Sequence, residues 1–210
     1  NPGTLGLGAK RTAGLVGSKA VTFDGTSGAY VSVGPGKNNG FSSTTGVAIE
    51  ALLKSQWSGA PGDTDAVFWK DDGASRIFLA LRNEAAYPDA VPAVAGGPVL
   101  SFGLNVGGTF SELALPLDGL EGRPALDFLR DGAVHHVAAT YDASTGLKSI
   151  CFDGRALAKA GLNQVPARYE GLDTLYTVET WNLSNRPTCG DYSSPVEGAI
   201  IAARYQSTKG

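Results

Sequence analysis

The sequence predicts an all-β fold, a sandwich of two antiparallel sheets. Three observations predict it: short segments in which apolar and polar residues alternate, frequent Gly-bearing turns between them, and no segment that keeps helical periodicity for three turns. The composition agrees, because 29 glycines and 11 prolines suit many short strands joined by tight turns. A chain of 210 residues fits one such domain.

The expected strands are spread along most of the chain. Besides the hairpin described next, they are expected at residues 19–23, 29–33, 47–54, 66–70, 76–83, 99–106, 109–115, 175–183 and 198–206. Residues 123–130 suit one short helical turn. Residues 1–14 are expected to form an N-terminal arm or leader strand, and residues 15–210 the sandwich domain.

The most informative segment is residues 131–154, which read DGAVHHVAATYDASTGLKSICFDG. It contains an alternating strand, a Gly-bearing turn at 142–146 and a second strand at 147–152. Four residues share one face of the first strand, namely His135, Val137, Ala139 and Tyr141. This pattern predicts a β-hairpin.

The hairpin resembles the signature hairpin of laminin G-like domains, which belong to the concanavalin A-like lectin/glucanase superfamily. Further segments resemble the family's strands in the family's order: VTFDGTSGAYVSV at 21–33, VAIEALLK at 47–54 and EGAIIAARYQ at 197–206. The resemblance covers nearly all of residues 15–206 and implies a jelly-roll sandwich. The sequence departs from the family at Leu52 and Val134, where a Trp is frequent.

The resemblance also raises the question of calcium, because many relatives hold this ion near their terminal strands. Calcium takes six to eight oxygen ligands. Asp24 is the candidate metal ligand, whereas Ile201 and Ala202 stand where the family often has an acidic pair. A structural calcium ion therefore stays open, and no cofactor is expected to be required.

Catalytic signatures of related glycan-cleaving enzymes do not occur in the sequence. Related β-glucanases carry ExDxxE on one strand, whereas Glu50 stands alone and Asp63 and Asp65 lie in a Gly/Pro-rich stretch. His135 and His136 are adjacent on a strand, point to opposite faces and cannot jointly hold a metal. A non-catalytic module is therefore favoured, and a hydrolase or lyase with an unrecognised site is the alternative.

Ligand binding is expected from aromatic side chains, because an aromatic face packs well on the C–H surface of a sugar ring. Trp69 lies in the apolar stretch AVFWK and is expected in the core, while Trp57 and Trp181 have Gly, Ser or Asn neighbours and are expected to be partly exposed. The candidate ligand-binding residues are Trp57, Trp181, Tyr87, Tyr192, Asp71, Asp72 and Arg76, with Arg82 as a further hydrogen-bonding group beside Trp69.

Charge and hydropathy limit the classes of partner. The net charge of −3 and the lack of a basic cluster give no reason to expect nucleic acid or an anionic membrane. No apolar run approaches the length of about 20 residues that spans a membrane. The expected partner is a carbohydrate or another surface ligand. A structural or adhesion domain that contacts protein is a further alternative.

Location and cysteine chemistry are linked. The chain begins at Asn1 and contains no methionine, so it is expected to be a segment of a larger multidomain protein. Family habit implies an extracellular, periplasmic or cell-surface location. Cys151 and Cys189 are either a disulfide pair or two small apolar residues, and the disulfide is favoured because it would tie a Gly/Pro/Ser-rich loop around Cys189.

Overall fold

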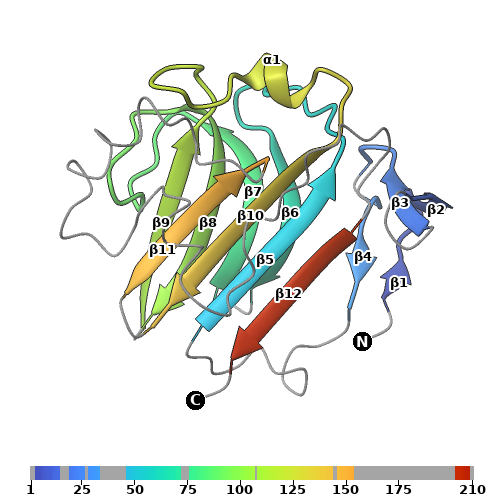
Figure 1. Ribbon diagram of the computed structural model, residues 1–210, viewed down its shortest axis with the longest axis horizontal. Helices are drawn as coiled ribbons and strands as arrows, with labels where there is room; N and C mark the ends of the chain where they lie inside the picture. The colour runs from blue at the N-terminus through green and yellow to red at the C-terminus, as the bar shows by residue number, and fades with distance from the viewer. Residues whose placement is uncertain are drawn as a thin grey trace.

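The structure is a computed structural model of the chain. It describes residues 3–14, 19–26, 28–33, 46–71, 76–106, 108–143, 146–153 and 202–208, with backbone only for 106, 147 and 202–208. The described part is nearly all β, and two four-stranded antiparallel sheets lie one behind the other (Figure 1). The predicted all-β class and its two antiparallel sheets are confirmed, whereas the jelly-roll connectivity stays a prediction.

The sheet nearer the viewer in Figure 1 has the strand order β11-β10-β5-β12. Its strands are β5 (Gly46–Leu53), β10 (His135–Asp142), β11 (Leu147–Phe152) and β12 (Ala202–Thr208). The predicted hairpin is confirmed as the β10–β11 pair, in which Val137 lies opposite Phe152 and Asp142 opposite Leu147. The strand expected at 175–183 lies outside the described residues.

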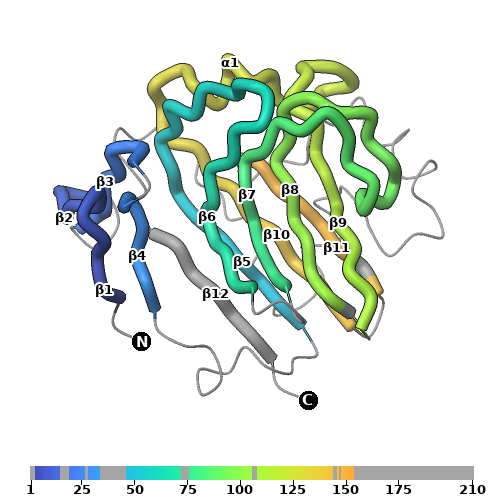
Figure 2. The backbone as a smooth tube through the Cα atoms, turned by 180° about the vertical axis from the view of Figure 1, so that it is seen from behind, coloured from blue at the N-terminus to red at the C-terminus, as the bar shows by residue number. Residues whose placement is uncertain are grey.

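The second sheet has the order β6-β7-β8-β9 and faces the viewer in Figure 2. Its strands are β6 (Thr64–Asp71), β7 (Arg76–Glu84), β8 (Gly97–Val106) and β9 (Thr109–Pro116). Gly108 has a φ of +83° in the turn between β8 and β9, a conformation that glycine adopts without steric cost. A register shift between Ala66 and Phe68 interrupts the β6–β7 ladder.

Two small sheets form the N-terminal region. β1 (Thr4–Leu5) pairs with β4 (Val31–Ser32), and β2 (Ala9–Ala13) pairs with β3 (Lys19–Phe23). The strand expected at 19–23 is confirmed, and the arm expected at 1–14 contains β1 and β2. The domain boundary after residue 14 stays a prediction.

Helix α1 (Leu126–Leu129) lies in the loops at one end of the sandwich (Figure 1). It confirms the short helical turn expected within residues 123–130. Leu129 is fully buried, so α1 covers that end of the core. Among the helices of the described residues, none is long and apolar enough to span a membrane.

The core lies between the two large sheets and follows directly from strand alternation. On β7, Ile77, Leu79 and Leu81 belong to the core cluster, and β5, β8, β9, β10 and β11 contribute residues at alternate positions in the same way. Burying one such side chain contributes about 1.5–3 kcal/mol. Because alternation sends the intervening side chains outward, Phe78 and Arg82 stand on the outer face of the β6–β9 sheet.

Candidate ligand-binding site

The outer face of the β6–β9 sheet brings together aromatic and charged side chains from β6, β7 and β9. Cross-strand register aligns Trp69 with Phe78, Phe78 with Gly103, and Gly103 with Glu112. We call this surface the Trp69 face. It comprises Trp69 and Asp71 on β6, Arg76, Phe78, Arg82 and Glu84 on β7, Gly103 and Asn105 on β8, and Phe110 and Glu112 on β9.

Three aromatic rings form a continuous row on the Trp69 face. The Trp69 and Phe78 rings are stacked, with centroids 4.6 Å apart and planes 13° apart. Phe78 also contacts Phe110 at a centroid distance of 6.1 Å. Trp69 is 45% exposed while Phe78 is 1% exposed. The buried Phe78 ring therefore supports an indole that remains open to solvent.

Gly103 makes room for this row. A Cβ at residue 103 would lie 2.6 Å from Cε1 of Phe78 and 2.8 Å from Cζ of Phe110. Real Cβ atoms essentially never approach other heavy atoms so closely. The absence of a side chain at Gly103 therefore lets the two phenylalanine rings cover β8, which is how glycine in a strand allows close packing.

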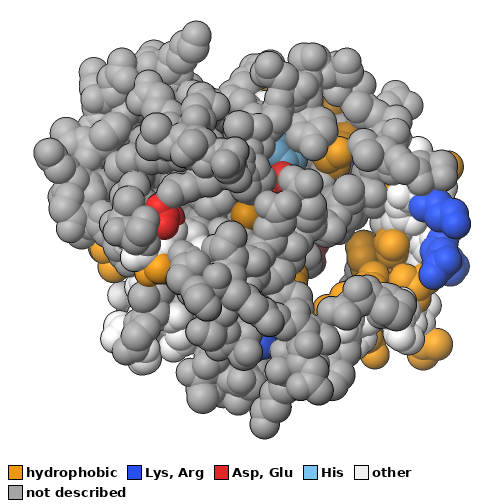
Figure 3. Space-filling view, turned by 60° about the horizontal axis from the view of Figure 1, so that its bottom comes forward, with side chains coloured by type: hydrophobic (Ala, Val, Ile, Leu, Met, Phe, Trp, Pro, Cys, Tyr) orange, Lys and Arg blue, Asp and Glu red, His pale blue; other side chains and the backbone are white. Residues whose placement is uncertain are grey.

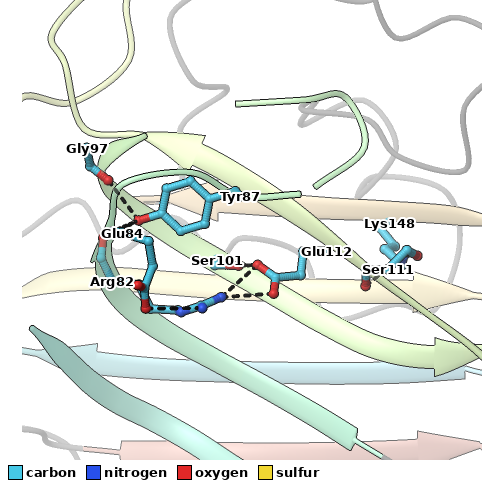
Figure 4. A network of polar contacts seen from close by, with 8 residues as sticks. All are labelled: Arg82, Glu84, Tyr87, Gly97, Ser101, Ser111, Glu112 and Lys148. Atoms are coloured by element: carbon cyan, nitrogen blue, oxygen red, sulfur yellow. Dashed lines mark hydrogen bonds and ion pairs between the residues drawn. The ribbon is translucent and has the colours of Figure 1, made fainter. Parts of the chain in front are cut away.

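The side chain of Arg82 is held in place by three hydrogen bonds to two carboxylates (Figure 4). Its Nη1 donates to both carboxylate oxygens of Glu112, at 2.9 and 2.8 Å, and its Nη2 donates to Oε1 of Glu84 at 3.3 Å. Ser101 Oγ donates to Oε2 of Glu112 at 2.9 Å. The guanidinium carbon lies 5.4 Å from the centroid of the Phe78 ring, within the range of a cation–π interaction.

Tyr87 anchors the loop between β7 and β8 (Figure 4). Its hydroxyl accepts a hydrogen bond from the Glu84 N–H at 2.8 Å and lies 2.8 and 3.0 Å from the carbonyl oxygens of Gly97 and Arg82, to which it can donate its single hydrogen. Burial is the main cause that raises the pKa of Tyr87. The residue is 3% exposed and packs with Ala90 and other apolar residues of a small separate cluster.

Asp71 and Arg76 form an ion pair beside the aromatic row. Arg76 Nε donates to Oδ2 of Asp71 at 2.6 Å, and the guanidinium lies 5.1 Å from the centroid of the Phe110 ring. The backbone N–H of Arg76 donates to Oδ1 of Asn105 at 2.6 Å. The side chain of Arg76 is 43% exposed, so part of its guanidinium faces solvent.

The structure corrects the predicted exposure of Trp57 and Trp69, and it also corrects the prediction that Tyr87 binds a ligand. Trp57 was expected to be partly exposed but is 3% exposed in the core cluster, and Trp69 was expected in the core but stands outward. Neither Trp57 nor Tyr87 offers a ring face to a ligand, because both rings are buried. Asp71 and Arg76, predicted as hydrogen-bonding groups, do lie together on the Trp69 face.

The structure does not describe the remaining predicted ligand-binding residues. Trp181, Tyr192 and Asp72 lie outside the described residues, and so does Cys189. Cys151 is buried in β11 at a position opposite Ala138. The disulfide between Cys151 and Cys189 therefore stays a prediction.

Asp24, the candidate metal ligand, lies in a turn with Thr26. Its Oδ1 accepts hydrogen bonds from the Thr26 hydroxyl and backbone N–H, at 2.7 and 3.0 Å, and these bonds lower the pKa of Asp24. Within the described part of the chain, no three His, Cys, Asp or Glu residues are grouped so that they could hold a metal ion. The described residues at Asp24 thus form a turn closed by Thr26, and calcium binding stays an open possibility.

The two histidines lie on opposite faces of β10, as the alternation predicts. His135 Nδ1 lies 2.8 Å from Oδ2 of Asp153, and its Nε2 lies 3.1 Å from Oδ1 of Asp131. Burial lowers the pKa of His135, but the hydrogen bonds and charges of the two aspartates outweigh it and raise the pKa above its usual value. His136 Nε2 lies 3.7 Å from Glu50 on the other face.

Sequence reasoning named Arg82 beside Trp69 but missed three other members of the Trp69 face, namely Phe78, Gly103 and Glu112. Phe78 and Arg82 alternate with the core residues of β7, so the pattern RIFLALRNE already places both on one face. Gly103 interrupts an otherwise apolar strand, which is a signal of close packing by another group. Glu112 gave no comparable signal, because its partners Arg82 and Ser101 come from two other strands.

Comparison with known proteins assigns no family to the chain. No protein-family model matches it, and no match was found among the curated proteins or the solved structures.

Proposed function

We propose that this chain is a non-catalytic recognition module that binds carbohydrate on the Trp69 face. The observation that carries the proposal is an indole 45% exposed and stacked on the buried Phe78. Sugars are bound by aromatic faces with hydrogen-bonding groups at the edge, and Asp71 and Arg76 provide such groups. The resulting contact would be shallow, since it lies on a sheet face.

The carboxylates of the Trp69 face favour recognition over glycan cleavage, because they are already bonded to other side chains of the protein. Glycoside hydrolysis needs one carboxyl group as acid and a second as base or nucleophile, both facing the substrate. Glu112 is buried and accepts hydrogen bonds from Arg82 and Ser101, while Glu84 accepts one from Arg82. Glu112 therefore holds the arginine rather than faces a substrate, while Glu84 and Asp71 are partly exposed but each is already paired with an arginine.

The proposal includes membership of the laminin G-like group and an extracellular or cell-surface location. It is supported by the order of the family-like segments in the sequence and by the β10–β11 hairpin within a two-sheet architecture. Fold alone does not imply function, so the site carries the argument for a ligand.

A glycan array of the full chain tests the proposal. We expect binding to at least one sugar class, loss of that binding in Trp69→Ala, and retention in Tyr30→Ala, which removes an exposed aromatic ring from the N-terminal region. Far-UV circular dichroism of both variants checks that they are folded. If the array shows no binding for the wild type, the carbohydrate proposal fails.

A second candidate, adhesion to another protein, is favoured by the N-terminal region. Leu7 is 98% exposed and Tyr30 is 55% exposed, and Lys10 and Arg11 on β2 are exposed as well. Figure 3 shows Lys and Arg side chains beside hydrophobic ones on the side where β2 and β3 lie in Figure 1. Contact between copies would appear in sedimentation velocity and would be lost in Leu7→Ser.

A further inference from the structure

The charged side chains of the Trp69 face are already paired with one another. At outward positions of β6–β9 stand two arginines and three carboxylates, namely Arg76, Arg82, Asp71, Glu84 and Glu112. Each arginine has a carboxylate partner within 2.8 Å. Together they leave one net negative charge on the face.

Arg82 is poorly placed to receive an anionic ligand, because both of its terminal nitrogens already bind carboxylates. Acidic sugars are recognised by an arginine that presents two parallel N–H groups to the ligand's carboxylate or sulfate. Nη1 of Arg82 is engaged by Glu112 and Nη2 by Glu84, and the side chain is 18% exposed. The ring of Phe78 lies beneath the guanidinium and closes a further side.

Arg76 is the more accessible cation, but its charge is also compensated. Its Nε binds Asp71, and its guanidinium lies against the Phe110 ring. The exposed part can donate to a sugar hydroxyl, and the Asp71 and Glu84 carboxylates, 22% and 38% exposed, can accept from one. The hydroxyls of a neutral sugar both donate and accept hydrogen bonds, so they can use the arginine and the carboxylates alike. The negative charge of an acidic sugar would instead lie near two partly exposed carboxylates.

We infer that the Trp69 face selects a neutral glycan, with the Trp69 indole stacking on a pyranose ring, and discriminates against uronic-acid and sulfated glycans. The inference rests on the proposed function and adds the class of sugar to it. The Trp69 face carries one net negative charge, and one like charge at contact distance lowers affinity by up to about fivefold in water, so an acidic glycan should bind up to that factor more weakly than a neutral one.

The test is isothermal titration calorimetry of the full chain at low and at physiological salt. The neutral probes are hexasaccharides of β-glucan, β-mannan and xylan, and the acidic probes are oligomers of alginate and polygalacturonate together with heparin fragments. We expect binding to a neutral probe, a loss of about tenfold or more in Trp69→Ala, and no change in Tyr30→Ala. Glu84→Gln should weaken discrimination against the acidic probes.

The possible outcomes separate the two claims. Preferred binding of an acidic probe that depends on Trp69 would overturn the neutral-glycan inference and leave the proposed function standing. Binding of a neutral probe that is unchanged in Trp69→Ala would overturn the inference, because the ligand would lie elsewhere. No binding of any probe, with a normal thermal transition, would overturn the proposed function itself.

Discussion

The ion pair between Arg82 and Glu112 gives the sharpest prediction about stability. We expect Glu112→Gln to destabilise the fold, because the amide nitrogen replaces one of the two oxygens that accept hydrogen bonds from Arg82. The Glu112 side chain is 6% exposed and also accepts from Ser101, so water cannot replace what is lost. Breaking a buried ion pair costs about 3–5 kcal/mol.

The structure indicates a smaller loss of stability for Glu112→Gln than for a fully buried ion pair. Arg82 keeps its hydrogen bond to Glu84 at 3.3 Å and is 18% exposed, so the guanidinium is neither fully buried nor without a carboxylate. We therefore expect a loss of about 2–3 kcal/mol in the free energy of unfolding. For a chain of this length, such a loss lowers the melting temperature by about 5–10 °C.

Differential scanning calorimetry at neutral pH measures this shift. The matched control is Glu121→Gln, which removes a carboxylate that accepts from Arg123 at 2.8 Å but is 48% exposed, where an ion pair contributes about 0–1 kcal/mol. Equal shifts for the two variants would refute the reasoning, because burial would then make no difference. Replacing both partners, as Arg82→Met with Glu112→Leu, should recover much of the loss.

Three further predictions concern packing, pH and calcium. Gly103→Ala should cost about 1–3 kcal/mol of stability by displacing the Phe78 ring, while Gly28→Ala, whose Cβ would make ordinary contacts at 3.5 Å, should cost less in the same thermal melts. Because the pKa of His135 is raised in the folded protein, protonation of His135 stabilises the fold below the histidine's unfolded pKa of about 6.5. This stabilisation should be lost as the pH rises through the pKa of His135 in the folded protein. The melting temperature of His135→Gln should therefore lack that decline between pH 6 and 8. If the calcium ion that the sequence leaves open is bound, chelator should lower the melting temperature by several degrees, and an unchanged melting temperature would count against calcium binding.

Much of the fold could be predicted because strand alternation is a local property. The β11 strand was predicted with its observed ends, and His135 and His136 fall on the two faces that a period of two requires. The bounds of the N-terminal strand β2 (Ala9–Ala13) were not predicted, because residues 1–14 were expected only as an arm or a leader strand. Its sequence AKRTA has little apolar content to alternate, and it is a strand through pairing with β3.

The exposure of the tryptophans could not be predicted, because it depends on features that sequence patterns do not contain. The apolar stretch AVFWK suggested that Trp69 is buried, but the register shift between Ala66 and Phe68 changes which β6 residues face the core. Phe68 packs against the core, and Trp69 therefore points outward. Trp57 has small polar neighbours and nevertheless belongs to the core cluster, because tertiary contacts decided its burial.

The site differs from the predicted one for a related physical reason. Sequence reasoning preferred Trp57 and Trp181 as binding groups because of their Gly, Ser or Asn neighbours, and expected Trp69 in the core. The exposed indole lies instead on a strand, fixed by Phe78, which is itself fixed by the space at Gly103 and by Arg82. A side chain held in this way loses little conformational freedom when a ligand binds, so even a shallow contact can yield useful affinity. The buried network beneath the Trp69 face thus links the stability of the sheet to the binding proposed for its surface.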